Sequence, residues 1–284
     1  MPIRSRDTLG AHLPLLVLFI LAALFIGWVL SGPARLARRR ARICRQPFPA
    51  AWRTILRRRV PLAAKLPPPL QLQLKRHIQI FLAEKRFIGC AGQPIDDEVR
   101  VTIAAQACLL QLNRAADHYP RLRQVLVYPG AFVVDRVHSE PSGILREERQ
   151  VLSGESWSQG QVILSWQDVL EGAAIADDGR NVVIHEFAHQ LDQDKGSANG
   201  APHQAGRLRR ERWAAVLSAE YARLQASVAE GRAGLLSDYA ATNPAEFFAV
   251  ASEVFFEQGR ELAEECPEVY RELSEFYRLD PRSW

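Results

Sequence analysis

The five residues His185-Glu186-Phe187-Ala188-His189 constrain this chain more than any other stretch of its sequence. Residues four positions apart lie on the same face of an α-helix, so His185 and His189 can bind one metal ion together. Zinc accepts two neutral imidazoles and a carboxylate, and it keeps a fourth position for water. Glu186 would then lie beside that water as a general base. The pattern therefore predicts the zinc centre of a peptide hydrolase.

The residues around this motif predict a helix that is mostly buried. Apolar residues dominate positions 182–184, and Leu191 continues the apolar face after the motif. Asp178 can cap the start of the helix. Two buried imidazoles need polar partners, and one metal ion satisfies both. The alternative is a pair of core histidines that form ordinary hydrogen bonds.

Composition and charge exclude several other classes of protein. The chain has 284 residues, 48% of them hydrophobic and 24% charged, as expected for a globular protein. Its formal charge is +4, but residues 1–47 contain eight arginines and one acidic residue, so residues 48–284 are acidic overall. We therefore expect no direct nucleic-acid binding. The cysteines are too widely spaced for a disulfide framework or a zinc ribbon, which favours a reduced compartment.

The N-terminal segment predicts a membrane anchor. Residues 1–12 form a tail, and residues 13–31 read as a single transmembrane helix, because residues 13–30 carry no charge and would span about 27 Å. Residues 32–47 form a basic linker, whose arginines argue against a cleaved signal peptide. The positive-inside rule then predicts a single-pass protein of the inner membrane with its catalytic domain in the cytoplasm. The alternative is a cytoplasmic protein.

Residues 48–284 predict one α+β domain, mainly helical, with a small mixed sheet packed on the motif helix. Apolar periodicity predicts further helices over residues 70–87, 96–112, 207–231, 244–258 and 267–277. Alternating apolar runs between turn residues predict strands over residues 124–128, 132–137, 148–152 and 161–166. An exposed edge of such a sheet could hold a peptide in extended form by strand addition.

The third protein ligand that a catalytic zinc needs is not fixed by spacing. His203 lies fourteen residues after the motif, and Asp192 is better placed to accept a hydrogen bond from a ligand imidazole. Glu246 is a candidate ligand, but residues 243–246 also fit a capping box in which Glu246 only closes a helix end. Glu253 shares a helix face with Glu246 and could support the site or replace it as ligand.

Five segments, in order along the chain, resemble the Mlc titration factor A family of bacterial zinc peptidases over nearly everything from about residue 50 to the end: residues 87–90, 101–110, 154–157, 185–192 and 243–249. The resemblance implies a zincin-type core related to the catalytic domain of anthrax lethal factor. It implies that His185, His189 and Glu246 bind Zn²⁺ and that Glu186 is the catalytic base. Tyr239 matches the family tyrosine over the zinc, where a phenol could donate to the oxyanion.

We therefore expect a membrane-anchored zinc metallopeptidase that acts on peptides, and the resemblance suggests aminopeptidase-like activity. The family namesake binds a transcriptional repressor that controls glucose uptake genes. The alternative function is thus a regulatory protein that sequesters a transcription factor at the membrane, with peptidase activity secondary. A purely structural zinc site would need a fourth Cys or His at suitable spacing, and the sequence offers none.

Overall fold

The computed structural model describes residues 8–114, 117–139, 145–152, 154–157, 160–193, 196 and 198–284. Contacts between residues divide the chain into two units, Met1–Pro47 and Phe48–Trp284. The first unit contains helix α1 (Thr8–Leu30) and helix α2 (Gly32–Arg45). Residues 1–7 of the predicted tail lie outside the described residues, and residues 8–12 belong to α1. The expected basic linker over residues 32–47 is largely helical and forms α2.

The apolar N-terminal helix does not meet the requirements for crossing a membrane by itself. Within the described residues, no single helix is both long enough and apolar enough to span a bilayer. The segments Leu16–Leu30 and Gly32–Arg45 meet the length and composition criteria only as a pair, with a bend of 44° between them. The predicted location at the inner membrane rested on one straight apolar helix over residues 13–31, and this prediction is wrong. The apolar segment ends at Leu30, where the chain bends and continues into the arginine-rich α2.

A small sheet forms the centre of the second unit. Three parallel strands lie side by side, and a fourth strand pairs antiparallel with the last of them at one edge, in the order β1 (Arg86–Gly89), β2 (Gln124–Tyr128), β6 (Gln161–Ser165) and β5 (Gly154–Trp157). The central strands β2 and β6 bury alternating or continuous apolar side chains. A separate antiparallel hairpin joins β3 (Phe132–Ser139) and β4 (Leu145–Leu152).

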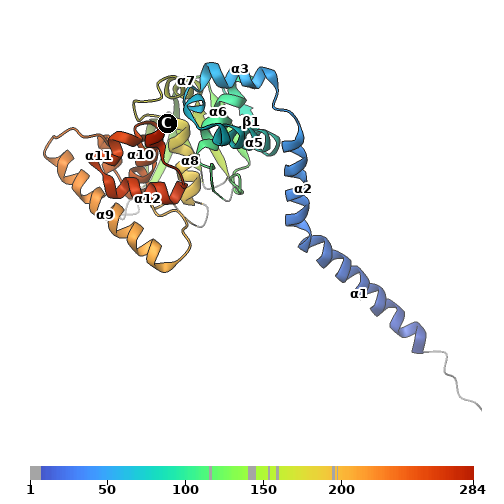
Figure 1. The fold of residues 1–284 in the computed structure, drawn as a ribbon. Helices are drawn as coiled ribbons and strands as arrows, with labels where there is room; N and C mark the ends of the chain where they lie inside the picture. Colours follow the sequence, from blue (N-terminus) through green and yellow to red (C-terminus); the bar gives the residue numbers. More distant parts are fainter. Residues whose placement is uncertain are drawn as a thin grey trace, which may run out of the picture. The chain divides into compact units, whose positions relative to one another are not determined.

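Helices account for most of the second unit, and one of them carries the histidine motif. The first group lies between residues 50 and 174 of the chain, before α8: α3 (Ala50–Arg59), α4 (Leu62–Lys65), α5 (Pro68–Glu84), α6 (Asp97–Leu109) and α7 (Trp166–Ala174). The second group is C-terminal: α8 (Val182–Asp192), α9 (Arg207–Ala229), η2 (Asp238–Ala241), α10 (Pro244–Glu257), α11 (Gly259–Glu265), α12 (Pro267–Tyr277) and η3 (Pro281–Ser283). Helix α8 lies between the green strands and the red helix α10 (Figure 1), and it packs on β5, β6 and α10.

An aromatic cluster anchors the buried face of α8. The ring of Phe187 lies 5.7 Å from that of Phe81 and 4.9 Å from that of Tyr119, measured between centroids. The Tyr119 hydroxyl donates to the Ala107 carbonyl of α6 over 2.6 Å, so its polar end is satisfied inside the core. Such aromatic pairs contribute about 0.5–1.5 kcal/mol beyond the burial of their area. The cluster therefore ties the motif helix to α5 and α6.

The α+β class predicted from the sequence is confirmed, with helices in the majority and a small sheet. Two short strands were not predicted. The first two residues of strand β1, 86 and 87, were expected to end the helix predicted over residues 70–87, but α5 stops at Glu84. Strand β5 has only four residues. Runs this short carry too few alternations to reveal a strand.

We predict that Gly200→Ala destabilises the fold. Gly200 has φ +76°, and an added Cβ would lie 2.3 Å from the carbonyl oxygen of Pro244, at the start of α10. The carbonyl of Gly200 also accepts from Trp213 Nε1 over 3.0 Å, which limits any shift. The expected loss in the free energy of unfolding is on the order of 1–3 kcal/mol, measured by urea denaturation. Gly234→Ala, where a Cβ meets nothing within 4 Å, is the matched control. Equal midpoints for the two variants would contradict this account.

Candidate functional site

The motif helix α8 begins at a cap that the structure assigns to Asn181. The side-chain oxygen of Asn181 accepts from the backbone N–H of Ile184 over 3.0 Å. Asp178, the cap expected from the sequence, instead accepts from the backbone N–H of Arg180 in the preceding turn. Both residues favour helix starts, and only the tertiary structure shows where the helical hydrogen bonds begin. From Asn181 onward the helix carries His185 and His189 on one face.

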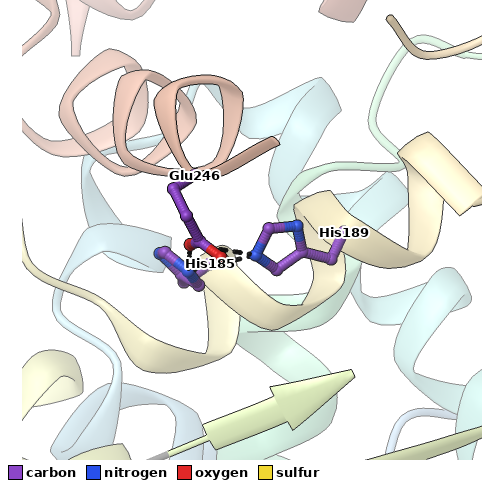
Figure 2. Close-up of side chains that lie close together, drawn as sticks. All are labelled: His185, His189 and Glu246. Carbon is purple, nitrogen blue, oxygen red and sulfur yellow. Dashed lines mark hydrogen bonds and ion pairs between the residues drawn. The ribbon is translucent and has the colours of Figure 1, made fainter. Parts of the chain in front are cut away.

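Helix α10 supplies the third converging side chain. Asn243 caps this helix by accepting from the backbone N–H groups of Ala245 and Glu246, at 2.9 and 3.0 Å. Pro244 occupies the first helical position, where its missing N–H costs nothing. Asn243 caps the helix without the side chain of Glu246, and the carboxylate of Glu246 is directed toward the two histidines of α8 (Figure 2).

Three ligand atoms meet at one point between the two helices. Glu246 Oε2 lies 2.9 Å from His185 Nε2 and 3.3 Å from His189 Nε2, and the two imidazole nitrogens are 3.2 Å apart. The side chains are mostly buried, with 10–17% of their surface exposed. Figure 2 shows Glu246 reaching from α10 toward the two rings on α8. The structure thus brings together the three side chains that the family resemblance implied as ligands.

This geometry fits a metal ion. Bonds of about 2.0–2.2 Å in tetrahedral arrangement hold ligand atoms about 3.3 Å apart, close to the separations found between the three atoms. Two imidazoles and one carboxylate from a buried pair of helices are also the donor set of a catalytic zinc site. His185, His189 and Glu246 are therefore the residues that could hold a metal ion.

The electrostatics of these side chains also suit a bound cation. Burial by itself would lower the pKa of His185, but its hydrogen bonds to Glu246 and Glu253 raise the pKa well above the ordinary value. Burial would likewise raise the pKa of Glu246, yet the hydrogen bonds from His185 and His189 hold that pKa far below its usual range. The cluster therefore favours positive charge between the two helices, which a proton or a metal cation can supply.

Glu253 contacts the rear of the site. One carboxylate oxygen lies 2.7 Å from Nδ1 of His185, the ring nitrogen turned away from Glu246. The other accepts from the backbone N–H of Asn181 over 2.5 Å. The sequence left Glu253 as either a supporting residue or an alternative ligand, and in the structure it lies behind His185 rather than in the group of three. Asn181 had no predicted place in the site, because a backbone donor leaves no signal in the sequence.

The structure separates the remaining candidates. Glu186 is buried on α8, one residue after His185. The half-exposed ring of Tyr239, on η2, lies 6.0 Å from the ring of His185 between centroids. His203 is exposed and does not belong to the converging group. Asp192 accepts from three backbone N–H groups of residues 199–201, so it fixes the following loop.

A buried His-Glu-x-x-His helix that faces a glutamate of a second helix, within an α+β domain, is the arrangement of a metallopeptidase. Comparison with known sequences agrees. Residues 34–278 match the family described as glucose-regulated metallo-peptidase M90, and the chain belongs to this family. The family implies a metal ion, and the group of His185, His189 and Glu246 is where the structure offers one a place.

The chain is similar along most of its length to several bacterial proteins. An uncharacterized protein of Synechocystis, slr2042, is 39% identical over 270 residues, covering 95% of this chain and 98% of that protein. Mlc titration factor A of Cronobacter sakazakii is 35% identical over 237 residues, covering 82% and 87%. Mlc titration factor A of Salmonella agona is 35% identical over 230 residues, covering 78% and 84%. The family resemblance seen in the sequence is thereby confirmed.

We predict that Glu257→Gln stabilises the protein as the pH rises. Burial is the main cause that raises the pKa of Glu257 from 4.5 to about 8, outweighing the hydrogen bond from Asn181. The folded protein then keeps this proton up to about pH 8 whereas the unfolded chain releases it near 4.5, so stability falls with rising pH across this interval. The variant cannot lose a proton there. Its advantage should grow from nothing near pH 4.5 to on the order of 5 kcal/mol above pH 8.

Urea denaturation across the same pH range measures this difference, with Glu261→Gln on the exposed surface of α11 as the control. A constant difference between wild type and Glu257→Gln at all pH values would contradict the buried, protonated carboxyl.

Proposed function

We propose that this protein is a zinc-dependent metallopeptidase that hydrolyses peptide bonds, with a zincin-like site and aminopeptidase-like activity. The observation that carries the proposal is the convergence of His185 Nε2, His189 Nε2 and Glu246 Oε2 within 3.3 Å of one another on two buried helices. Membership of a metallo-peptidase family supports it. The aminopeptidase assignment rests on the resemblance between the motifs.

His185, His189 and Glu246 would hold the zinc ion. When bound, zinc polarises a peptide carbonyl and lowers the pKa of water at the site. The imidazoles would contribute neutral nitrogen ligands and Glu246 one negative charge, so a bound zinc ion would give these four groups a net positive charge. A set of three protein ligands is typical of a catalytic zinc site rather than a structural one.

Glu186 and Tyr239 would carry the proton transfers and the charge stabilisation. Glu186 follows the first histidine on α8 and is buried beside it, where its carboxylate accepts a proton from the attacking water and returns it to the leaving amine. Tyr239 lies across His185 and keeps about half of its surface exposed. Its phenol can donate to the oxyanion that develops on the substrate carbonyl.

The edge of the sheet supplies a place for an extended peptide. Strand β5 pairs with β6 on one side, stands at the end of the strand order and packs against α8. A peptide added along β5 gains main-chain hydrogen bonds and runs beside the helix that carries the histidines. The substrate class that follows is a short peptide bound in extended conformation.

Two variants test the mechanism and separate chemistry from metal binding. Glu186→Gln should keep zinc and lose hydrolysis of short peptides by about 100-fold or more, because the amide cannot take the proton. Glu246→Ala should lose zinc as well, since one of the three ligands is gone. Metal analysis of the purified full-length chain and a peptide-library digest measure the two effects. Undiminished turnover by Glu186→Gln would refute its role as base, and full zinc occupancy in Glu246→Ala would leave Glu246 no role as a ligand.

A second function is supported by the relatives. Proteins called Mlc titration factor A are 34–35% identical to this chain over most of its length, and the name describes the binding of a protein, Mlc. We propose that this chain can also bind a transcriptional repressor of that type. Such binding needs no zinc chemistry, so both activities can reside in one chain.

The Glu186→Gln variant distinguishes the two functions. If repressor binding is a separate activity, Glu186→Gln should co-elute with purified Mlc in size-exclusion chromatography as well as the wild type does, while it no longer hydrolyses peptides. Its folded surface should be unchanged, because the substitution replaces one buried group by another of the same size. If neither the wild type nor Glu186→Gln co-elutes with the repressor, this second function is refuted.

A further inference from the structure

The carboxylate of Glu253 joins two groups on α8 that lie four residues apart. Oε1 lies 2.7 Å from Nδ1 of His185, and Oε2 lies 2.5 Å from the backbone nitrogen of Asn181. The side chain is 9% exposed, so water competes little for either oxygen. Glu253 comes from the middle of α10, two turns after Glu246. One helix thus presents a carboxylate to each nitrogen of the same imidazole ring.

The two groups that Glu253 contacts, Nδ1 of His185 and the backbone N–H of Asn181, both require a hydrogen-bond acceptor at this position. A carboxylate only accepts hydrogen bonds, so a hydrogen on Nδ1 of His185 points to Glu253. In a neutral imidazole with its hydrogen on Nδ1, Nε2 carries the lone pair. That Nε2 is the atom that faces Glu246 and His189. Glu253 therefore selects the form of His185 that can bind a cation at the meeting point of the three side chains.

Asn181 keeps Glu253 in place from the other side. Its side-chain oxygen caps α8, and its side-chain nitrogen donates to the carbonyl of Gly172 and to Glu257. Because the side chain is fixed by these three contacts, the backbone N–H is fixed too, and it points to Glu253. A glutamine at position 253 has one accepting oxygen and one donating nitrogen. It could satisfy only one of the two donors and would set an N–H against the other.

We propose that Glu253, held by the backbone of Asn181, is a positioning residue that fixes the ring orientation and the tautomer of His185 for metal binding. This inference rests on the proposed function only in its choice of metal. It makes the site asymmetric. His185 is oriented by a carboxylate, whereas Nδ1 of His189 is buried and has no hydrogen-bond partner among the described residues. Partners of this kind contribute about 10–100-fold to metal affinity where they are present.

Zinc affinity of the full-length chain tests the proposal, measured at pH 7 by competition with a chromophoric chelator. Glu253→Gln should bind Zn²⁺ about 10–100-fold more weakly than the wild type. Glu257→Gln is the matched control, because Glu257 lies on the same helix, also contacts Asn181 and is not part of the proposed ligand set. Its accepting oxygen survives the substitution, so its zinc affinity should equal that of the wild type. Equal affinity in Glu253→Gln, or an equal loss in Glu257→Gln, would overturn the proposal.

A spectroscopic measurement on the folded, zinc-loaded protein separates positioning from a general loss of stability. In ¹H–¹⁵N spectra, the Nδ1–H of His185 should give a slowly exchanging, downfield resonance in the wild type and in Glu257→Gln. In Glu253→Gln this resonance should move upfield or disappear. Its absence from the wild-type spectrum would overturn the inference without any variant. A wild-type protein that binds zinc and shows this resonance but hydrolyses no peptide would refute the peptidase function and leave the inference standing.

Discussion

The contact between α8 and α10 is the interaction on which the rest of the domain depends. Glu246 and Glu253 of one helix meet His185 of the other in a region from which water is largely excluded. Burying a carboxylate or an imidazole without a partner costs free energy. The two helices therefore pack in the position where each of these groups meets its partner. The aromatic cluster behind Phe187 then holds α8 against α5 and α6. Site geometry and core packing are therefore set by the same helix.

The loop after α8 contributes to this arrangement from the far end. Asp192 gathers three backbone N–H groups of residues 199–201, and burial raises the pKa of its carboxyl although those hydrogen bonds and His189 lower it. Gly200 in that loop closely approaches the backbone of Pro244, where α10 begins. One acidic side chain at the end of the motif helix thus sets the position of the loop beside the start of the helix that carries Glu246. The separation of the two helices is fixed at both ends, by Asn181 and by Asp192.

The sequence predicted the parts of the site that follow local rules. The spacing of His185 and His189 is a property of a single helix, and the structure places their nitrogens 3.2 Å apart. Spacing did not decide whether Glu246 is a metal ligand or part of a helix cap, because that depends on how two helices distant in sequence pack. Only the family resemblance favoured the role of ligand. The contact of Asn181 with Glu253 could not be predicted, since Asn181 makes it through its backbone N–H. The N-terminal prediction failed because apolar composition does not reveal a bend.

The distance along the chain between the converging side chains has a consequence for synthesis. Glu246 follows His185 by 61 residues. At about 5–20 residues per second, a ribosome makes the two imidazoles roughly 3–12 s before the carboxylate that meets them. A nascent or truncated chain that ends before α10 contains the complete His-Glu-x-x-His motif but no closed group of three. The group of three ligand atoms can therefore form only after α10 has been made, and a chain that ends before Glu246 cannot form it.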